Sequence, residues 1–207
     1  MRPRNPERWA LLALATAALC LLASMATAHT YPKNKCVSGS GCEPDNNYHT
    51  WCYRKVERTQ SRNAWEAHRS YMNGFKNFTI KSTPDRCGSK TDLWLYDSTD
   101  LSGLGFFAFY QCQKVKSNGE CERASVWIDD NVLEGRGFST TQMRNAKRSL
   151  WCHEAGHSVG LAHLNVAQCV NGCGCMSNNL QTTSLTFSAY RYYTSHDRSH
   201  IENDLDR

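Results

Sequence analysis

Two stretches of the chain carry large apolar and aromatic residues at helical spacing. One runs from Ser61 to Met72, where Ser61 is a good capping residue at the start and Gly74 closes the helix. The other begins at Ser139 or Thr140, both of which favour the first position before a helix. We therefore expect two long helices, separated by a region with a different periodicity.

Short runs of aromatic and β-branched residues predict about five short strands. They are Tyr48–Val56, Phe78–Ile80, Leu93–Tyr96, Gly105–Gln111 and Ser125–Asp129. The order strand, helix, several strands and helix is satisfied by an α/β (α+β) fold, a twisted mixed sheet backed by two long helices. The part that follows is mostly irregular and ends in a short helix over Ser195–Leu205. Its expected cap is Ser195 or Asp197, and its expected buried residues are Ile201 and Leu205.

The N-terminus has the pattern of a secretory signal. A basic segment over residues 1–8 precedes an apolar run, and Ala26-Thr27-Ala28 offers a cleavage site, so we expect a signal peptide over residues 1–28. An uncleaved signal anchor is the alternative. Residues 29–207 suit a single domain, in which residues 29–47 form an irregular arm tethered by disulfides. No other stretch is apolar enough to span a membrane.

Cysteine usage agrees with export. Eleven cysteines occur in the chain, and Cys20 would leave with the signal peptide, so ten remain. An even, high number in an exported chain predicts disulfides, although their connectivity cannot be deduced. The formal net charge of +5 falls to +3 when Arg2, Arg4, Arg8 and Glu7 are removed. Such a mild charge gives no reason to expect nucleic acid as a partner.

The stretch from His153 to His163 reads H-E-x-x-H-x-x-G-x-x-H. On a helix, His153 and His157 project from one face and can bind a single zinc ion, with Glu154 beside them as a base. Gly160 can adopt a left-handed conformation that ends the helix and brings His163 back as a third ligand. Three protein nitrogens leave a fourth position for water, which is typical of a catalytic zinc site.

The helix face gives Glu154 a physical reason to be there. At about 100° per residue, a core-facing apolar stripe runs into the histidines and includes the glutamate. An unpaired charge on that face would cost several kcal/mol unless a metal-bound water meets it. Cys152 lies on the far side of the helix, so we expect it in a disulfide and not on the metal. The stripe consists of Met143, Ala146, Leu150, His153, Glu154 and His157.

These residues resemble the elongated motif of the metzincin zinc endopeptidases at all five fixed positions. Met176 stands where that clan has its Met-turn methionine, a hydrophobic floor under the zinc ligands. The resemblance implies a zinc cleft and a small irregular C-terminal subdomain. The subfamily stays open between matrixin-like and adamalysin-like members. Asn178 stands where the astacin and serralysin pattern has a tyrosine ligand, so no tyrosine ligand is expected. Cys87, in a segment similar to the cysteine switch of latent matrixins, is expected in a disulfide.

By the same resemblance, the strand before Asn118 is the antiparallel edge strand that lines the cleft. Its main chain would then hydrogen-bond an extended peptide, and tyrosines further on would form a pocket wall. Packing into the core is the alternative reading for both sets of side chains. The candidate substrate-binding residues are Gly103, Leu104, Gly105, Phe106, Phe107 and Tyr190.

The sequence therefore predicts a secreted, monomeric zinc endopeptidase that acts on protein or peptide substrates. One catalytic Zn²⁺ would polarise the scissile carbonyl and lower the pKa of its water, and Glu154 would be the general base. No residue pattern indicates a structural Ca²⁺. The rival from another class is a non-catalytic, disulfide-rich exported binding protein that retains a zinc site, but such a protein would need neither Glu154 nor Gly160.

Overall fold

The computed structural model describes residues 44–83, 87–97, 107–164, 174–177, 186 and 188–204. In this part of the chain, five strands form one sheet in the order β2-β1-β3-β5-β4. Three neighbouring pairs are parallel, whereas β4 runs antiparallel to β5 at the edge. The predicted mixed sheet of five short strands is confirmed. The strands are β1 (Tyr48–Lys55), β2 (Thr79–Ser82), β3 (Leu93–Tyr96), β4 (Ala108–Val115) and β5 (Cys121–Ile128).

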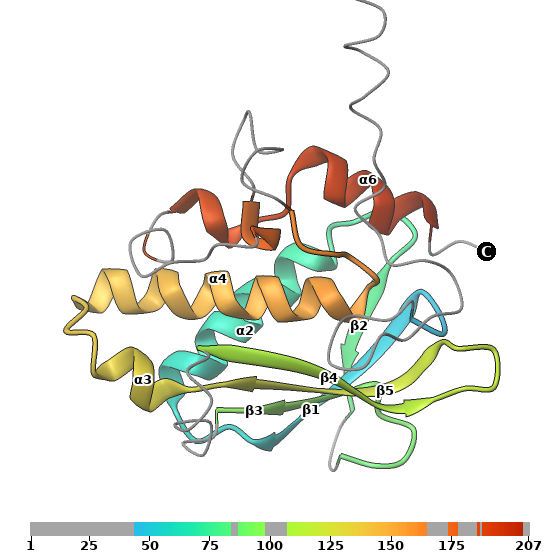
Figure 1. The fold of residues 1–207 in the computed structure, drawn as a ribbon, viewed down its shortest axis with the longest axis horizontal. Helices are drawn as coiled ribbons and strands as arrows, with labels where there is room; N and C mark the ends of the chain where they lie inside the picture. The colour runs from blue at the N-terminus through green and yellow to red at the C-terminus, as the bar shows by residue number, and fades with distance from the viewer. Residues whose placement is uncertain are drawn as a thin grey trace, which may run out of the picture.

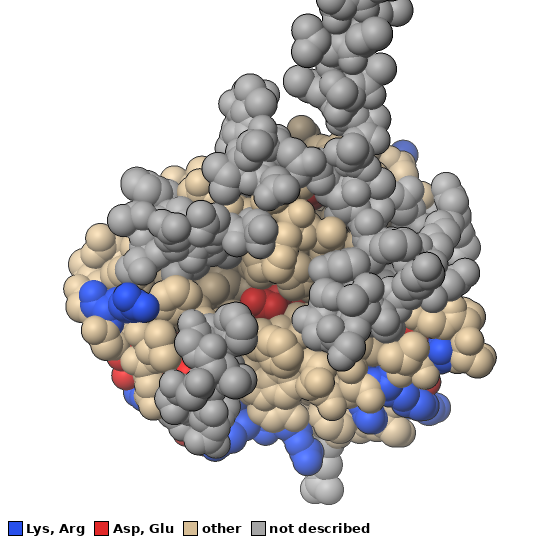
Figure 2. Space-filling model, in the orientation of Figure 1, with Lys and Arg blue, Asp and Glu red and all other residues tan. Residues whose placement is uncertain are grey.

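The two long helices lie on the same side of the sheet, with a group of short helical segments beyond them (Figure 1; Figure 2 gives the same view as a space-filling model). None of the helices within the described ranges combines the length and apolar character needed to cross a membrane. The helical segments are α2 (Thr59–Met72), α3 (Asp130–Glu134), α4 (Thr140–Ser158), η2 (Gly174–Met176), η3 (Ser188–Arg191) and α6 (Ser195–Asp204).

A row of tryptophans joins the sheet to both long helices. Trp65 on α2 contacts Trp51 on β1 and Trp151 on α4 edge to face, with ring centroids 5.5 and 5.4 Å apart. All three side chains are buried. Aromatic residues of this size bury roughly 150–250 Å² each, and edge-to-face pairs add further stabilisation. The row therefore fixes α4 against the sheet and against α2.

Local capping explains where α4 begins. Ser139 accepts a hydrogen bond from the backbone N–H of Gln142, and the Gln142 side chain accepts one from the backbone N–H of Ser139. This reciprocal capping box satisfies two donors at the helix start. Of the two predicted caps, Ser139 is the one used. The long helix that carries the histidine motif is thus specified by its own first turn.

Several predicted boundaries were wrong by a few residues. α2 begins at Thr59, so Ser61 lies buried inside the helix and is not its cap. β4 starts and ends later than the predicted Gly105–Gln111. Its later end reflects pairing with β5 that continues up to the turn at Gly119. The cap of α6 is Thr194, whose hydroxyl accepts from the N–H of Asp197. Ile201 is buried as expected, and Leu205 lies outside the described residues.

Three disulfides occur in the described part of the chain. They join Cys52 to Cys87, Cys112 to Cys121, and Cys152 to Cys175. The predictions that Cys87 and Cys152 are half-cystines are confirmed. The remaining four cysteines of the expected ten, Cys36, Cys42, Cys169 and Cys173, lie outside the described residues, as do the expected signal peptide and most of the N-terminal arm.

Candidate active site

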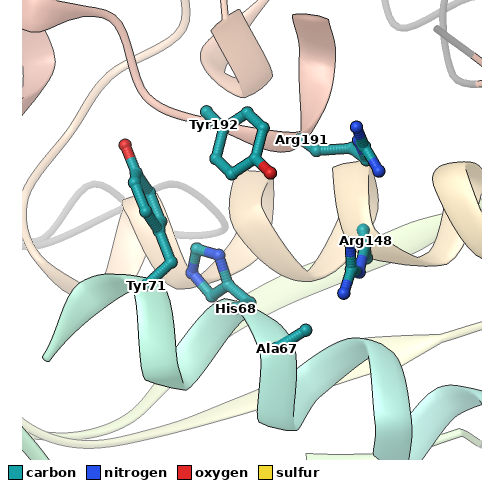
Figure 3. Close-up of a pocket in the computed structure, with 6 residues that line it drawn as sticks. All are labelled: Ala67, His68, Tyr71, Arg148, Arg191 and Tyr192. Carbon is teal, nitrogen blue, oxygen red and sulfur yellow. The ribbon is translucent and has the colours of Figure 1, made fainter. Parts of the chain in front are cut away.

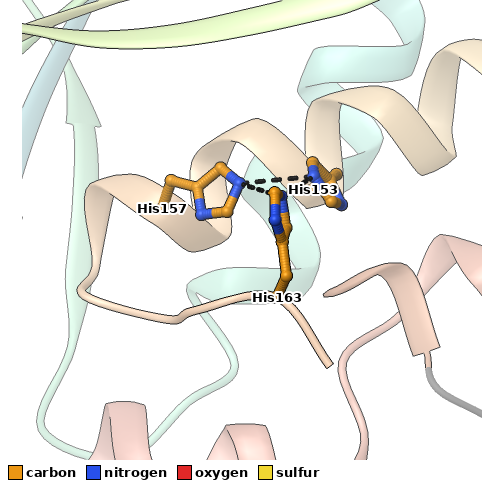
Figure 4. A group of neighbouring side chains, drawn as sticks. All are labelled: His153, His157 and His163. Carbon is orange, nitrogen blue, oxygen red and sulfur yellow. Dashed lines mark hydrogen bonds between the residues drawn. The ribbon is translucent and has the colours of Figure 1, made fainter. Parts of the chain in front are cut away.

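The three motif histidines converge at the end of α4 (Figure 4). His153 and His157 lie one turn apart on the helix, and Gly160, at φ 83°, turns the chain back towards them. That left-handed conformation suits glycine because it has no Cβ. His163 then completes the cluster. The Nε2 atom of His163 lies 2.9 Å from that of His153 and 3.0 Å from that of His157, and the last pair is 3.2 Å apart.

The protonation of these rings fits a metal ion. Nδ1 of His153 lies 2.7 Å from the carbonyl oxygen of Cys175, and Nδ1 of His157 lies 2.8 Å from that of Leu161. A carbonyl oxygen can only accept, so both Nδ1 atoms donate, and in the neutral ring each Nε2 keeps its lone pair. Burial lowers the pKa of both histidines, to about 4 for His153, which favours this neutral form.

Converging lone pairs repel each other unless a cation lies between them. Three nitrogens around a tetrahedral zinc ion at 2.0–2.1 Å would lie about 3.3 Å apart. The observed separations of 2.9–3.2 Å are close to that value. Backbone carbonyls orient two of the ligands, which is the usual support for a metal-bound histidine. The donor set and its geometry therefore fit a zinc site.

Glu154 lies beside these ligands in a low-polarity environment. Its side chain is buried, and none of the described cationic side chains forms an ion pair with it. Burial raises the pKa of this carboxyl to about 8. A carboxyl group with such a pKa can hold or release a proton near neutral pH.

Met176 packs directly against the turn of α4 that carries the first two histidines. A Cβ atom added at Gly156 would meet Met176 Sδ as its nearest neighbour, with Met176 Cε at 3.0 Å and Tyr193 Cε1 at 3.1 Å. Met176 is fully buried. The absence of a side chain at Gly156 thus lets the methionine lie against the helix backbone, in the position that the sequence predicts for a hydrophobic floor.

Two backbone contacts tie Leu164, the residue after His163, to the segment Met176-Ser177. Leu164 donates to the carbonyl oxygen of Met176 at 2.7 Å, and it forms an isolated parallel bridge with Ser177. Tyr193 adds support from the other side, because its hydroxyl donates to the carbonyl oxygen of Cys152 at 2.9 Å. The sequence analysis could not predict these supporting contacts, because most of the atoms that form them belong to the main chain, which is the same for every residue type.

The sheet edge lies next to the histidine cluster. β4 is the antiparallel edge strand, as predicted, and the ring of Tyr110 on it lies 6.0 Å from that of His157. Phe107, just before β4, is half-buried, and its carbonyl oxygen accepts from the N–H of Asp129. The other candidate substrate-binding residues of this segment, Gly103, Leu104, Gly105 and Phe106, lie outside the described residues.

The C-terminal tyrosines divide between the surface and the core. Tyr190 on η3 is half-buried against the core cluster, and Tyr192 is exposed. Tyr193 is buried among α2 side chains, with its ring 5.6 Å from that of His68. Tyr193 therefore packs into the core and does not form a pocket wall. Tyr190 remains a candidate for contact with substrate.

Comparisons with known proteins give structural matches only. No protein-family model and no curated protein matches the chain. Archaemetzincin from Methanopyrus kandleri is 13% identical over 79% of this chain and 99% of its own, with a TM-score of 0.49. Archaemetzincin from Archaeoglobus fulgidus, complexed with malonate, is 12% identical over 73% and 98%, with a TM-score of 0.44. Myroilysin is 11% identical over 84% and 96%, with a TM-score of 0.43.

Proposed function

We propose that this chain is a secreted, disulfide-stabilised zinc endopeptidase of the metzincin type. The observation that carries the proposal is the convergence of the three Nε2 atoms of His153, His157 and His163 beside the buried carboxyl of Glu154. The motif, the left-handed Gly160 and the methionine under the helix all support the same reading. The signal-like N-terminus and the disulfides support export.

The three histidines would hold the ion, which supplies Lewis acidity towards a carbonyl and makes water more acidic. A cation among them would favour the charged form of Glu154 and so lower the pKa of its carboxyl from the value that burial imposes. Glu154 would then take a proton from the attacking water and pass it to the leaving amine. Met176 would keep the ligands in place without touching the substrate.

An extended peptide is the substrate that the surroundings of the site suit best. β4 leaves one side of its backbone free of strand partners in the described sheet, and it lies next to His157. A peptide added along such an edge gains main-chain hydrogen bonds that do not depend on its sequence. Side-chain pockets along the cleft would then set which residues flank the cleaved bond.

The test is cleavage of a broad peptide library by the purified chain, with its zinc content measured in parallel. We expect about one zinc per chain, cleavage that a chelator abolishes, and recovery when zinc is restored. Glu154→Gln should keep the zinc and lose about 10²–10⁴-fold in activity, because the proton acceptor is gone. The exposed Glu57 gives a matched control, since Glu57→Gln removes the same group far from the motif.

Full activity of a zinc-loaded Glu154→Gln protein would overturn the mechanism. Zinc binding without cleavage of any peptide by the native chain would instead favour the rival, a binding protein that retains a metal site. His163→Ala tests the proposed ligand set, because it should lower the zinc content as well as the activity. A His163→Ala protein that kept its full zinc content would remove this histidine from the ligand set.

A further inference from the structure

A small cavity lies between α2, α4 and η3 (Figure 3). Its volume is about 120 Å³. At about 100° per residue, Arg148 is about 140° around α4 from His153, so the cavity opens on the side of the helix away from the zinc ligands. Figure 3 shows two arginines from different elements beside this space. The lining residues are Ala67, His68, Tyr71, Arg148, Arg191 and Tyr192.

Neither arginine has an acidic partner among the described residues. Arg148 forms no ion pair there, and its buried Nε has no hydrogen-bond partner. Among the described residues, Arg191 donates to neutral oxygens, the carbonyl of Ser188 at 3.2 Å and Oδ1 of Asn145 at 3.3 Å. Its guanidinium also lies 5.5 Å from the ring of Tyr192. Two positive charges thus line one small cavity, and the described part of the chain supplies no acidic side chain to pair with either.

The histidine of the lining adds no charge of its own. His68 is buried, its Nδ1 has no hydrogen-bond partner, and burial lowers its pKa to about 3. The imidazole is therefore neutral at physiological pH. Tyr71 and Tyr192 close the space with their rings edge to face, 5.0 Å apart. A buried nitrogen without a partner and an unpaired buried guanidinium nitrogen both cost free energy unless a ligand or water reaches them.

We propose that this cavity binds a small oxyanion, such as phosphate or a carboxylate. Guanidinium groups present paired N–H donors that match the oxygens of these anions. The space corresponds to roughly four water molecules at about 30 Å³ each, which suits a group of four or five heavy atoms. An anion held between Arg148 on α4 and Arg191 on η3 would join the active-site helix to the segment after the methionine turn. The site is separate from the proposed peptidase cleft.

Thermal unfolding of the zinc-loaded protein with inorganic phosphate tests this site. Phosphate titrations at constant ionic strength, balanced with chloride, should raise Tm as expected for a ligand that binds only the folded chain. Arg148→Gln and Arg191→Gln should each weaken the apparent phosphate affinity by about tenfold or more. Arg144→Gln is the matched control, because Arg144 is exposed on the same helix and carries the same charge. Acetate in place of phosphate tells a carboxylate site from a phosphate site.

Three outcomes would overturn the proposal. One is the lack of any stabilisation by phosphate or acetate beyond that of chloride. Another is a loss of phosphate affinity in Arg144→Gln equal to that in Arg148→Gln and Arg191→Gln, which would mean that the effect comes from overall charge. The third is stabilisation that persists in Arg148→Gln and Arg191→Gln, which would put the anion on the zinc or elsewhere. If one glutamine variant fails to fold, the other arginine still gives an independent measurement, and Arg148→Lys retains the charge with fewer donors.

Discussion

Cys152 and Cys175 are joined by a disulfide, and each directly precedes a residue of the candidate zinc site. Cys152 is followed by His153 in the helix, and Cys175 is followed by Met176 in the turn below it. The carbonyl oxygen of Cys175 also accepts the hydrogen bond of His153 Nδ1. The same bridge therefore fixes the position of the methionine and the orientation of a ligand ring.

Removing this bridge should cost both stability and metal binding. In Cys152→Ala/Cys175→Ala, we expect a loss of about 3 kcal/mol in the free energy of unfolding, since a loop of this length constrains the unfolded chain. Urea denaturation measures the loss, and zinc titration should show weaker binding. Cys112→Ala/Cys121→Ala is the matched control, because that bridge lies in the β4–β5 hairpin. The control should lose a similar amount of stability and keep its zinc affinity. Weaker zinc binding in both proteins would contradict a specific role of the Cys152–Cys175 bridge at the metal site.

Gly156→Ala should disturb the site through a single methyl group. The new Cβ would meet Met176 Sδ and approach the ring of Tyr193, in a fully packed region. Overpacking of this kind costs about 1–3 kcal/mol. Calorimetry should show the loss of stability, and peptide cleavage should show a loss of activity. Gly135→Ala, where the added Cβ meets only ordinary contacts, is the control. In a double-mutant cycle, Gly156→Ala should cost less stability in a Met176→Ala background than in the native chain, and an equal cost would mean that the methionine is not the obstacle.

The pair Lys147–Asp130 is the buried ion pair of the described core. The Lys147 ammonium lies 2.8 Å from Asp130 Oδ2, and both side chains are almost completely buried. Burial raises the pKa of Asp130, and Lys147 opposes that shift. Lys147→Met leaves the carboxylate unpaired and should cost about 3–5 kcal/mol in chemical denaturation. Lys114→Met, in the exposed pair with Glu122, should cost less than about 1 kcal/mol. Similar losses of unfolding free energy in Lys147→Met and Lys114→Met would mean that burial does not set the cost of breaking these ion pairs.

His68 should make the fold sensitive to mild acid. Its pKa is about 3 in the folded chain and about 6.5 unfolded, so between these values the unfolded state binds the extra proton. Stability is complete above pH 6.5 and falls as the pH drops towards 3, by about 3 kcal/mol at pH 4.5. Among the described residues, the polar groups that face it are Tyr71, Tyr193, Arg148 and Arg191, and none of these is a carboxylic acid.

The measurement is the free energy of unfolding at pH 7 and pH 4.5 for the native chain and for His68→Gln. Other buried histidines titrate in both proteins, so the difference between them isolates His68. We expect the variant to lose less stability on acidification. An identical loss in the two proteins would mean that His68 is protonated in the folded state or that its site opens in acid.

Local patterns predicted much of this molecule. The motif from His153 to His163 contains its own helix, its own left-handed turn and all three ligands, so a short stretch was enough to predict the cluster. Alternation and residue type predicted the strands, and helix-face arithmetic put Cys152 opposite the metal. Each of these inferences depends on neighbours along the chain, which the sequence shows directly.

What the sequence did not reveal depends on contacts between distant segments. The partner of Cys152 is set by the packing of the methionine turn under α4, and ten cysteines allow too many pairings to choose one. The ring-orienting carbonyls of Cys175 and Leu161 have no residue-type signal. The start of α2 at Thr59 reflects the carboxylate of Asp97, which accepts from the N–H groups of Glu57 and Arg58 just before the helix. That contact joins residues about forty positions apart.

The strand order has a consequence for how the protein reaches its native state. Parallel neighbours such as β1 and β3, or β3 and β5, join segments far apart in the chain, and such contacts slow folding. The turn that contains Met176 packs against Gly156 on α4, so the complete site needs contacts between distant segments as well as the local histidine motif. Zinc uptake should therefore be a late event in refolding, and its rate would report the arrival of the complete native chain.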